Sequence, residues 1–175
     1  MKKIIVLILL TILFNPAYSQ ETTELKQAKK QEEKEKFQET KRILESKSFV
    51  LETDYLQDRR GNRIMVNPTI NFIEVNSETG VIQIGSDYRI GPNGVGGVTA
   101  KGKITKWELE QNKKKKNFNV TMHVMTSIGS YDVHMSIGYD GKARARLSGM
   151  KPITLIFDGE IVPLSESKTY EGSSI

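Results

Sequence analysis

Residues 117–147 read NFNVTMHVMTSIGSYDVHMSIGYDGKARARL, and this stretch decides the fold. Apolar residues occupy alternate positions on both sides of its centre, which is the pattern of β-strands with one buried face. A two-residue turn at Ile128-Gly129 would place Met122 opposite Met135 and would make three neighbouring cross-strand pairs apolar as well. The stretch therefore predicts an antiparallel hairpin with one face in the core and the other in water.

The sequence that follows predicts two further hairpins. Asp140-Gly141 is a strong turn signal, and residues 143–147 after it alternate small apolar residues with two arginines. A third hairpin is predicted where a strand at 153–157 turns at Asp158-Gly159 into a second strand at 160–163.

Strand periodicity also extends towards the N-terminus. Residues 49–55 alternate, with Phe49, Tyr55 and the odd-numbered residues between them on one face. Residues 98–110 change phase, which a β-bulge near Thr105-Lys106 explains. Shorter strands are expected at 63–66, 69–75 and 81–84. The sequence thus predicts an all-β fold, an antiparallel sandwich or barrel of about eight to ten short strands.

One charged N-terminal α-helix is expected to precede the strands. Residues 20–47 contain no Gly or Pro and are rich in strong helix formers, and their apolar residues are too sparse to bury the whole helix. Its last turns are expected to dock through Phe37 and Leu44. The predicted organisation is a signal peptide at 1–19, a charged helical leader at 20–47 and a single β-rich domain at 48–175.

The first nineteen residues have the layout of a secretory signal peptide. Two lysines are followed by an apolar run over residues 4–14, and Ala17-Tyr18-Ser19 supplies small residues two apart. The apolar run is about half the roughly 20 residues that a spanning helix needs. We therefore expect cleavage after Ser19 and export, with no transmembrane anchor left after cleavage.

Composition narrows the classes of partner and chemistry. The chain has 26 basic and 21 acidic residues, and removal of Lys2 and Lys3 with the signal peptide leaves 24 against 21. This small excess, together with export, argues against a nucleic-acid partner. The absence of cysteine excludes disulfides, a thiolate nucleophile and iron–sulfur clusters. No cofactor is predicted.

The two histidines form a weak candidate metal site. In the register above, His123 and His134 are direct cross-strand neighbours, and Asp132 lies on the same face as a third candidate ligand. That face also carries Thr121 and Ser136, as an ordinary solvated sheet surface does. The pattern favours a solvated pair, and no metal site is predicted.

A glycine-dense segment at 91–98, GPNGVGGV, is the other candidate site. It does not match a phosphate-binding loop, because the Walker pattern would need lysine where Gly97 stands and a helix afterwards. Its glycines suit a loop that joins two strands. A loop that lines a ligand or partner site is the alternative. The residues concerned are Gly91, Asn93, Gly94, Gly96 and Gly97.

Three motifs together carry a resemblance to a known family. They are Asn67-Pro68, the segment GPNGVGGVT at 91–99, and a tail that runs from Asp158-Gly159 through VPLSES at 162–167 to Tyr170-Glu171-Gly172. In this combination the chain resembles the uncharacterised exported bacterial proteins of domain-of-unknown-function family 4251, found mainly in Bacteroidota. The resemblance implies a single compact domain in the periplasm or outer envelope of a Gram-negative bacterium. It implies no catalytic residue.

Two classes of function remain open. The first is a non-enzymatic binding or interaction domain of the bacterial envelope, with an envelope component or a small ligand as its partner. The second is a hydrolase that acts on envelope glycans or lipids, which would need a deep pocket with two buried carboxylates. The sequence predicts neither the ligand nor the oligomeric state.

Overall fold

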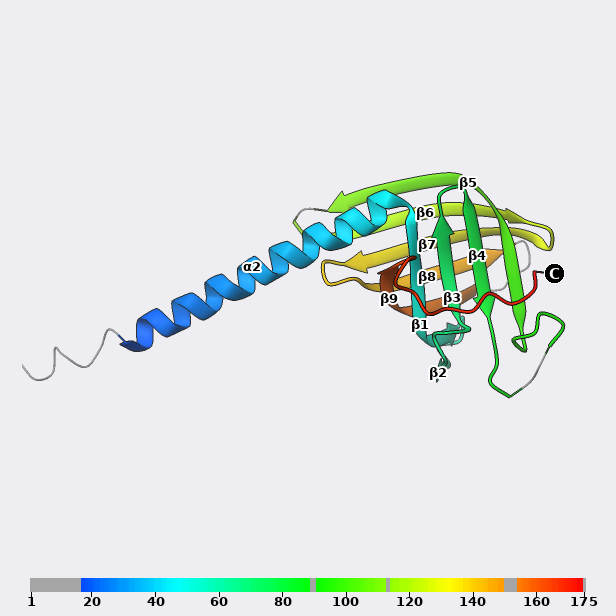
Figure 1. The fold of residues 1–175 in the computed structure, drawn as a ribbon, viewed down its shortest axis with the longest axis horizontal. Helices are drawn as coiled ribbons and strands as arrows, with labels where there is room; N and C mark the ends of the chain where they lie inside the picture. The colour runs from blue at the N-terminus through cyan, green and yellow to red at the C-terminus, as the bar shows by residue number, and fades with distance from the viewer. Residues whose placement is uncertain (1–16, 89–90, 113, 150–153, 175) are drawn as a thin grey trace, which may run out of the picture. The chain divides into compact units, whose positions relative to one another are not determined.

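One helix is followed by nine antiparallel strands in the structure, a computed structural model that describes residues 17–88, 91–112, 114–149 and 154–174 (Figure 1). The elements are α2 (Ala17–Ser46), β1 (Ser48–Asp58), β2 (Arg63–Met65), β3 (Phe72–Asn76), β4 (Thr79–Ile84), β5 (Val98–Asn112), β6 (Asn117–Thr126), β7 (Gly129–Gly138), β8 (Lys142–Gly149) and β9 (Thr154–Pro163). Over these residues the strand order is β2-β1-β3-β4-β5-β6-β7-β8-β9, and β1 also pairs with β9. That last pairing closes eight strands into a barrel and leaves β2 as an extra strand beside β1. The predicted all-β class with one preceding helix is confirmed, and of the two predicted architectures the chain adopts the barrel.

Helix α2 belongs to two units of the chain, which divide between Glu35 and Lys36. In the first unit the described side chains of the helix are almost all exposed. In the second unit Phe37 stacks on Phe118 with ring centroids 4.9 Å apart, and Leu44 is fully buried. The predicted docking of Phe37 and Leu44 is confirmed. Among the described residues, no helix has the length and apolar character needed to cross a membrane.

The interior of the barrel is filled with side chains. Inward-facing apolar residues of all eight barrel strands form one buried cluster. The largest fully buried members are Phe49, Phe118, Phe157, Leu51, Ile73, Met122 and Ile137. Burial of each such side chain stabilises the fold by about 1.5–3 kcal/mol. Packing thus occupies the space in which some other barrels hold a ligand.

Two β-bulges adjust which side chains face the core. The register between β5 and β6 shifts between Ile104 and Lys106, so the predicted bulge is confirmed. A second shift lies between Thr53 and Tyr55 on β1. The extra residue turns Leu56 into the core and moves Tyr55 out of it. The prediction that Tyr55 shares the core face with Phe49 was therefore wrong.

The β6–β7 hairpin differs in register from the prediction. The two turn residues are Ser127-Ile128 and not Ile128-Gly129, so Met122 pairs with Val133 and not with Met135. The error is two residues along β7, and an even shift leaves every side chain on its predicted face. Alternation of apolar and polar residues cannot detect such a shift, because both registers bury the same residues.

The predicted third hairpin does not exist. Asp158-Gly159 lies within the continuous strand β9, where Asp158 pairs with Arg144 of β8 on one side and Tyr55 of β1 on the other. A Cβ atom on Gly159 would lie 1.8 Å from the backbone oxygen of Glu52. The glycine is needed for close approach of two strands beside the β1 bulge, and not for a turn.

Residues 164–174, here called the tail segment, run across the outer surface of β1, β3 and β4 (Figure 1). A second buried apolar cluster lies on the outward side of these strands, with Leu164 of the tail segment packed against it. Its buried members are Val50, Phe72 and Val81. This covering explains why three consecutive residues at the start of β1 are buried, although a barrel strand normally buries every second one.

Candidate functional site

The outward-facing residues of β6 to β9 form the candidate site, here called the open face. The strand pairings align Asn119, Ser136, Arg144 and Asp158 in one row across the four strands, and Tyr55 of β1 continues that row. A neighbouring row contains a threonine of β6, a histidine of β7, an arginine of β8 and an isoleucine of β9. These are Thr121, His134, Arg146 and Ile156.

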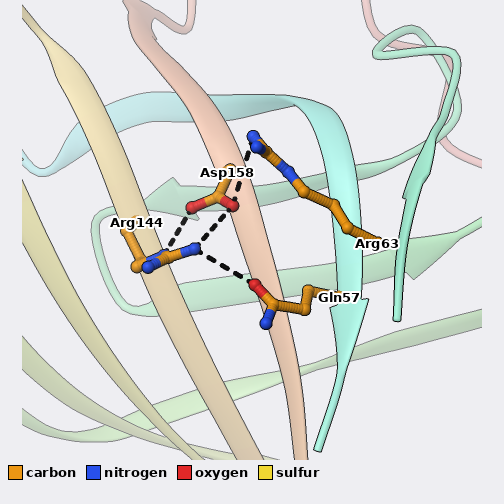
Figure 2. Close-up of polar contacts among 4 residues, drawn as sticks. All are labelled: Gln57, Arg63, Arg144 and Asp158. Carbon is orange, nitrogen blue, oxygen red and sulfur yellow. Dashed lines mark hydrogen bonds and ion pairs between the residues drawn. The ribbon is translucent and has the colours of Figure 1, made fainter. Parts of the chain in front are cut away.

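Asp158 is at the centre of a charged cluster on the open face (Figure 2). Arg144 donates from Nε to Asp158 Oδ1 at 2.6 Å and from Nη2 to Oδ2 at 3.0 Å. Arg144 Nη2 also donates to Gln57 Oε1 at 3.1 Å, and Arg63 Nη2 lies 3.5 Å from Asp158 Oδ2. The hydrogen bonds to Asp158, and then the attraction of its charge, raise the pKa of Arg144 above its ordinary value. The cluster therefore places two arginine cations around one carboxylate.

Two shallow depressions meet at this cluster. The first has a volume of about 550 Å³ and is lined by Asp158, Arg144, Arg63 and Tyr55, with the Arg63 guanidinium 3.9 Å from the centre of the Tyr55 ring. The second, about 540 Å³, is lined by Arg146, His134 and Glu110 among others. Arg144 and Ser136 line both depressions. Together they make an open groove rather than a deep pocket.

The open face offers unused hydrogen-bond donors. The exposed Arg146 guanidinium contacts no acidic side chain in the described part of the chain. Arg146 and Arg144 are two apart on β8, so their side chains point the same way. Between them the two arginines can hold the oxygens of an anionic group, because guanidinium donors match carboxylate and phosphate geometry.

The Asp158 carboxylate of the open face is held by arginine. Both Asp158 oxygens already accept hydrogen bonds from arginine. Glu74, on β3 and away from the open face, has a pKa raised above its ordinary value. Loss of solvent raises the pKa of Glu74 most, the nearby charge of Glu171 adds to this, and Lys101 opposes it.

The structure separates the two histidines of the candidate metal site. His123 pairs with Asp132, and its Nδ1 lies 2.7 Å from Asp132 Oδ1. His134 instead pairs with Thr121, with His134 Nδ1 and Thr121 Oγ1 3.2 Å apart. The prediction that the histidines are direct neighbours was wrong, because it depended on the register that is two residues out. In the described part of the chain no three His, Asp or Glu side chains are grouped to hold a metal.

The glycine-dense loop uses its polar groups internally. Asn93 is fully buried, its Oδ1 accepts the N–H groups of residues 95 and 97, and its Nδ2 donates to Thr99 Oγ1 at 3.1 Å. Gly94 and Gly96 have positive φ angles of 78° and 74°. Gly91 packs against Gly96, and a Cβ atom on Gly97 would lie 2.0 Å from a backbone oxygen of β4. The Asn93 side chain and the glycines therefore stabilise the loop, while the backbone oxygen of Asn93 accepts the N–H of Ser173 in the tail segment.

Sequence reasoning missed the residues that form the open-face cluster. The two arginines were predicted to face outward, but Asp158 was assigned to a turn, where it would not meet them. Asp-Gly is a strong turn signal, and no local feature reveals that the pair lies in mid-strand. Gln83, a fully buried side chain of β4, was also missed. A polar residue within the apolar run 81–84 was the available signal.

Comparisons with known proteins agree with this fold. A crystal structure of a DUF4251 family protein from Bacteroides eggerthii is similar, with a TM-score of 0.63 and 26% sequence identity, over 75% of this chain and 90% of that one. No curated protein matches the chain. The family model for the domain of unknown function DUF4251 matches residues 31–161, which is most of the chain. The chain therefore belongs to the DUF4251 family.

Proposed function

We propose that this protein is an exported, non-enzymatic binding module of the bacterial envelope, and that its open face binds an anionic group of an envelope component. The observation that carries the proposal is the pair of arginines on β8. Arg144 is neutralised by Asp158, whereas the exposed Arg146 beside it has no acidic partner among the described residues. The pair thus provides one fixed and one available guanidinium on the floor of a groove.

The packed barrel interior supports a surface site. Because side chains from all eight barrel strands fill the interior, a ligand has to bind outside. On the β1–β3–β4 side the outer surface is covered by the tail segment. The open face of β6 to β9 is therefore the sheet surface best suited to contact a partner.

Export is supported by the sequence of residues 1–19. Residues 1–16 lie outside the described residues, so the argument is the charged start, the short apolar run and the small residues before position 20. The periplasm or the outer envelope is the compartment that we propose.

The hydrolase alternative lacks support in the described part of the chain. The depressions on the open face are shallow, and both carboxylate oxygens of Asp158, which lines the first depression, already accept hydrogen bonds from Arg144. His123 and Asp132 form a pair on the sheet surface, and neither residue lines either depression. We therefore propose the binding module alone.

Titration of the 15N-labelled protein, from residue 20 onward, tests the proposal. The probes are inorganic phosphate and a short galacturonate oligosaccharide, followed by NMR. We expect shifts centred on residues 134–146, a loss of affinity of about tenfold in Arg146→Ala, and partial retention in Arg146→Lys. Lys115→Ala, which removes a positive charge from the β5–β6 turn, is the matched control. Equal weakening in the control, or shifts spread over all lysines and arginines, would contradict a specific site.

A further inference from the structure

A second interaction site lies under the tail segment, away from the open face. The backbone of the tail segment bonds to three separate parts of the barrel. Tyr170 N donates to Thr69 O at 2.8 Å, Ser173 N donates to Asn93 O at 2.8 Å, and Leu164 N donates to the first residue of β1 at 3.1 Å. The tail segment is therefore held on the barrel through its backbone, as peptides often are in their binding sites.

Gln83 binds the backbone of this segment with both ends of its carboxamide. Its Nε2 donates to Tyr170 O at 2.8 Å, and its Oε1 accepts the N–H of Gly172 at 2.8 Å. The Gln83 side chain is fully buried, and Thr99 Oγ1 donates to the same Oε1 at 2.9 Å. Asn93 in turn donates to Thr99. This chain of hydrogen bonds fixes the Gln83 carboxamide in the orientation that pairs with a peptide backbone.

Two further contacts make the site selective for sequence. Lys101 Nζ lies 2.9 Å and 3.0 Å from the two carboxylate oxygens of Glu171. A Cβ atom at Gly172 would lie 2.4 Å from the backbone oxygen of Asn93 and 2.9 Å from the Val95 side chain. The site therefore accepts an acidic residue followed by glycine, and it excludes larger residues at the second position.

The contacts that hold residues 170–174 are few and mostly polar. Of these residues only Gly172 is buried, and the Tyr170 side chain is 63% exposed. A turn precedes them, in which Glu166 and Ser167 both donate their N–H groups to Pro163 O. Rotation at this turn would release the segment from the groove, with loss of the hydrogen bonds that Ser167 Oγ and Lys168 N donate to Glu52 Oε1, and would leave the strand pairings of the barrel unchanged.

We propose that the groove formed by Thr69, Gln83, Asn93 and Lys101 is a peptide-binding site whose partner is the tail segment of a second copy of this chain, so that two copies associate by exchanging tails. The second copy carries the same acidic residue and glycine, which the groove already fits in charge and shape. The same contacts then form between copies as within one copy. This proposal is independent of the anionic ligand of the open face.

Charge exchange between full-length chains tests the proposal. In Lys101→Glu and in Glu171→Lys, each chain repels its own tail. When the two variants are mixed, every tail meets a groove of opposite charge in the other copy. We expect native mass spectrometry at equal concentrations to show at least tenfold more heterodimer in the mixture than dimer in either variant alone. The double variant K101E/E171K, whose own tail and groove match again, is the control and should form no more dimer than the unaltered chain.

A second measurement covers specificity and folding. Labelled peptide KTYEGSSI, the sequence of residues 168–175, should bind Glu171→Lys, whose own tail is repelled, at least tenfold more tightly than it binds the unaltered chain. The same peptide with alanine for glycine should not bind. Circular dichroism establishes that each variant is folded. Absence of heterodimer from a mixture of folded variants overturns the proposal, and so does failure of the glycine peptide to bind.

Discussion

Single residues on β9 and β3 show how close packing and charge determine local stability. Gly159 is needed because β1 and β9 approach each other at the bulge on β1, where a side chain would overlap the Glu52 backbone. Glu74 is partly buried and Glu171 of the tail segment lies near it, so loss of solvent and then the like charge raise its pKa. Both residues have roles that no neighbour in sequence reveals.

Gly159→Ala should destabilise the fold by about 3 kcal/mol or more. The added Cβ would overlap backbone atoms of Glu52, and these cannot shift unless the whole strand β1 shifts with them. Urea unfolding followed by circular dichroism measures the change. Gly94→Ala is the control, because no atom lies within 4 Å of the Cβ position there and only the positive φ opposes the change, at about 1 kcal/mol. Similar losses at the two positions would refute the close-approach argument.

Glu74→Gln should stabilise the protein at neutral pH. The folded-state pKa of Glu74 lies above its ordinary value, so folding favours the protonated form. Stability from this group is therefore full below the ordinary pKa and is lost as the pH rises through the folded-state pKa. Glutamine is uncharged at every pH, and because Glu74 is partly exposed we expect a gain below about 1 kcal/mol at pH 7. The gain should disappear near pH 4, which urea unfolding of the two proteins at both pH values measures.

At the scale of one element, two features of the β6–β7 hairpin determine different things. The alternation of apolar and polar residues determines which face is buried, and the turn determines the register. Alternation assigns Met122 to the core, and this is confirmed, since the side chain is fully buried. The register is set instead by the Ser127-Ile128 turn, where Thr126 Oγ1 donates to Gly129 O at 2.7 Å and accepts the N–H of residue 128 at 3.3 Å. Thr126 supports the turn that defines the pairing.

Met122→Asp should abolish cooperative unfolding or reduce stability by about 3–5 kcal/mol, because a carboxylate would enter the packed interior. His123→Ser on the opposite face should change stability by less than about 1 kcal/mol. Thermal unfolding followed by circular dichroism compares the two variants. A tolerated Met122→Asp would contradict the assignment of the faces.

A double-mutant cycle tests the observed register. His123→Gln and Asp132→Asn should be coupled by about 0.3–1 kcal/mol, because the two side chains form a surface pair. The pair His123→Gln and His134→Gln should be additive, since these residues are not opposite each other. Coupling between the two histidines, measured by urea unfolding, would favour the register predicted from sequence.

At the scale of the whole molecule, the barrel unit is stabilised by its own core. Only the last turns of α2 contribute to that core, through Leu44 and the stacked Phe37. The outer surface of the barrel is covered on one side only. The tail segment covers β1, β3 and β4, and the open face of β6 to β9 remains accessible.

Deletion of residues 20–35 should leave the midpoint of thermal unfolding within a few degrees, because the described side chains of that segment bury almost no apolar surface. Phe37→Ala should lower the midpoint of thermal unfolding more than the deletion does. The loss of the contact with Phe118 should reduce the free energy of unfolding by about 2–4 kcal/mol. Loss of cooperative unfolding on deletion would show that the first unit contributes to the fold.

The sequence by itself determined most of the strands, the turn at Asp140-Gly141 and the inward or outward direction of most side chains, because these depend on residues a few positions apart. The bulge in β5 and the alternation in β6 and β8 followed from such local patterns. Only the tertiary structure decided the closure of β1 on β9, the continuity of β9 through Asp158 and the coverage by the tail segment. These features depend on contacts between residues about a hundred positions apart, which leave no periodic signal along the chain. For β6 and β7 the sequence determined which side chains face the core, but only the structure determined the register. A two-residue period fixes a strand's face but not its position along the partner strand.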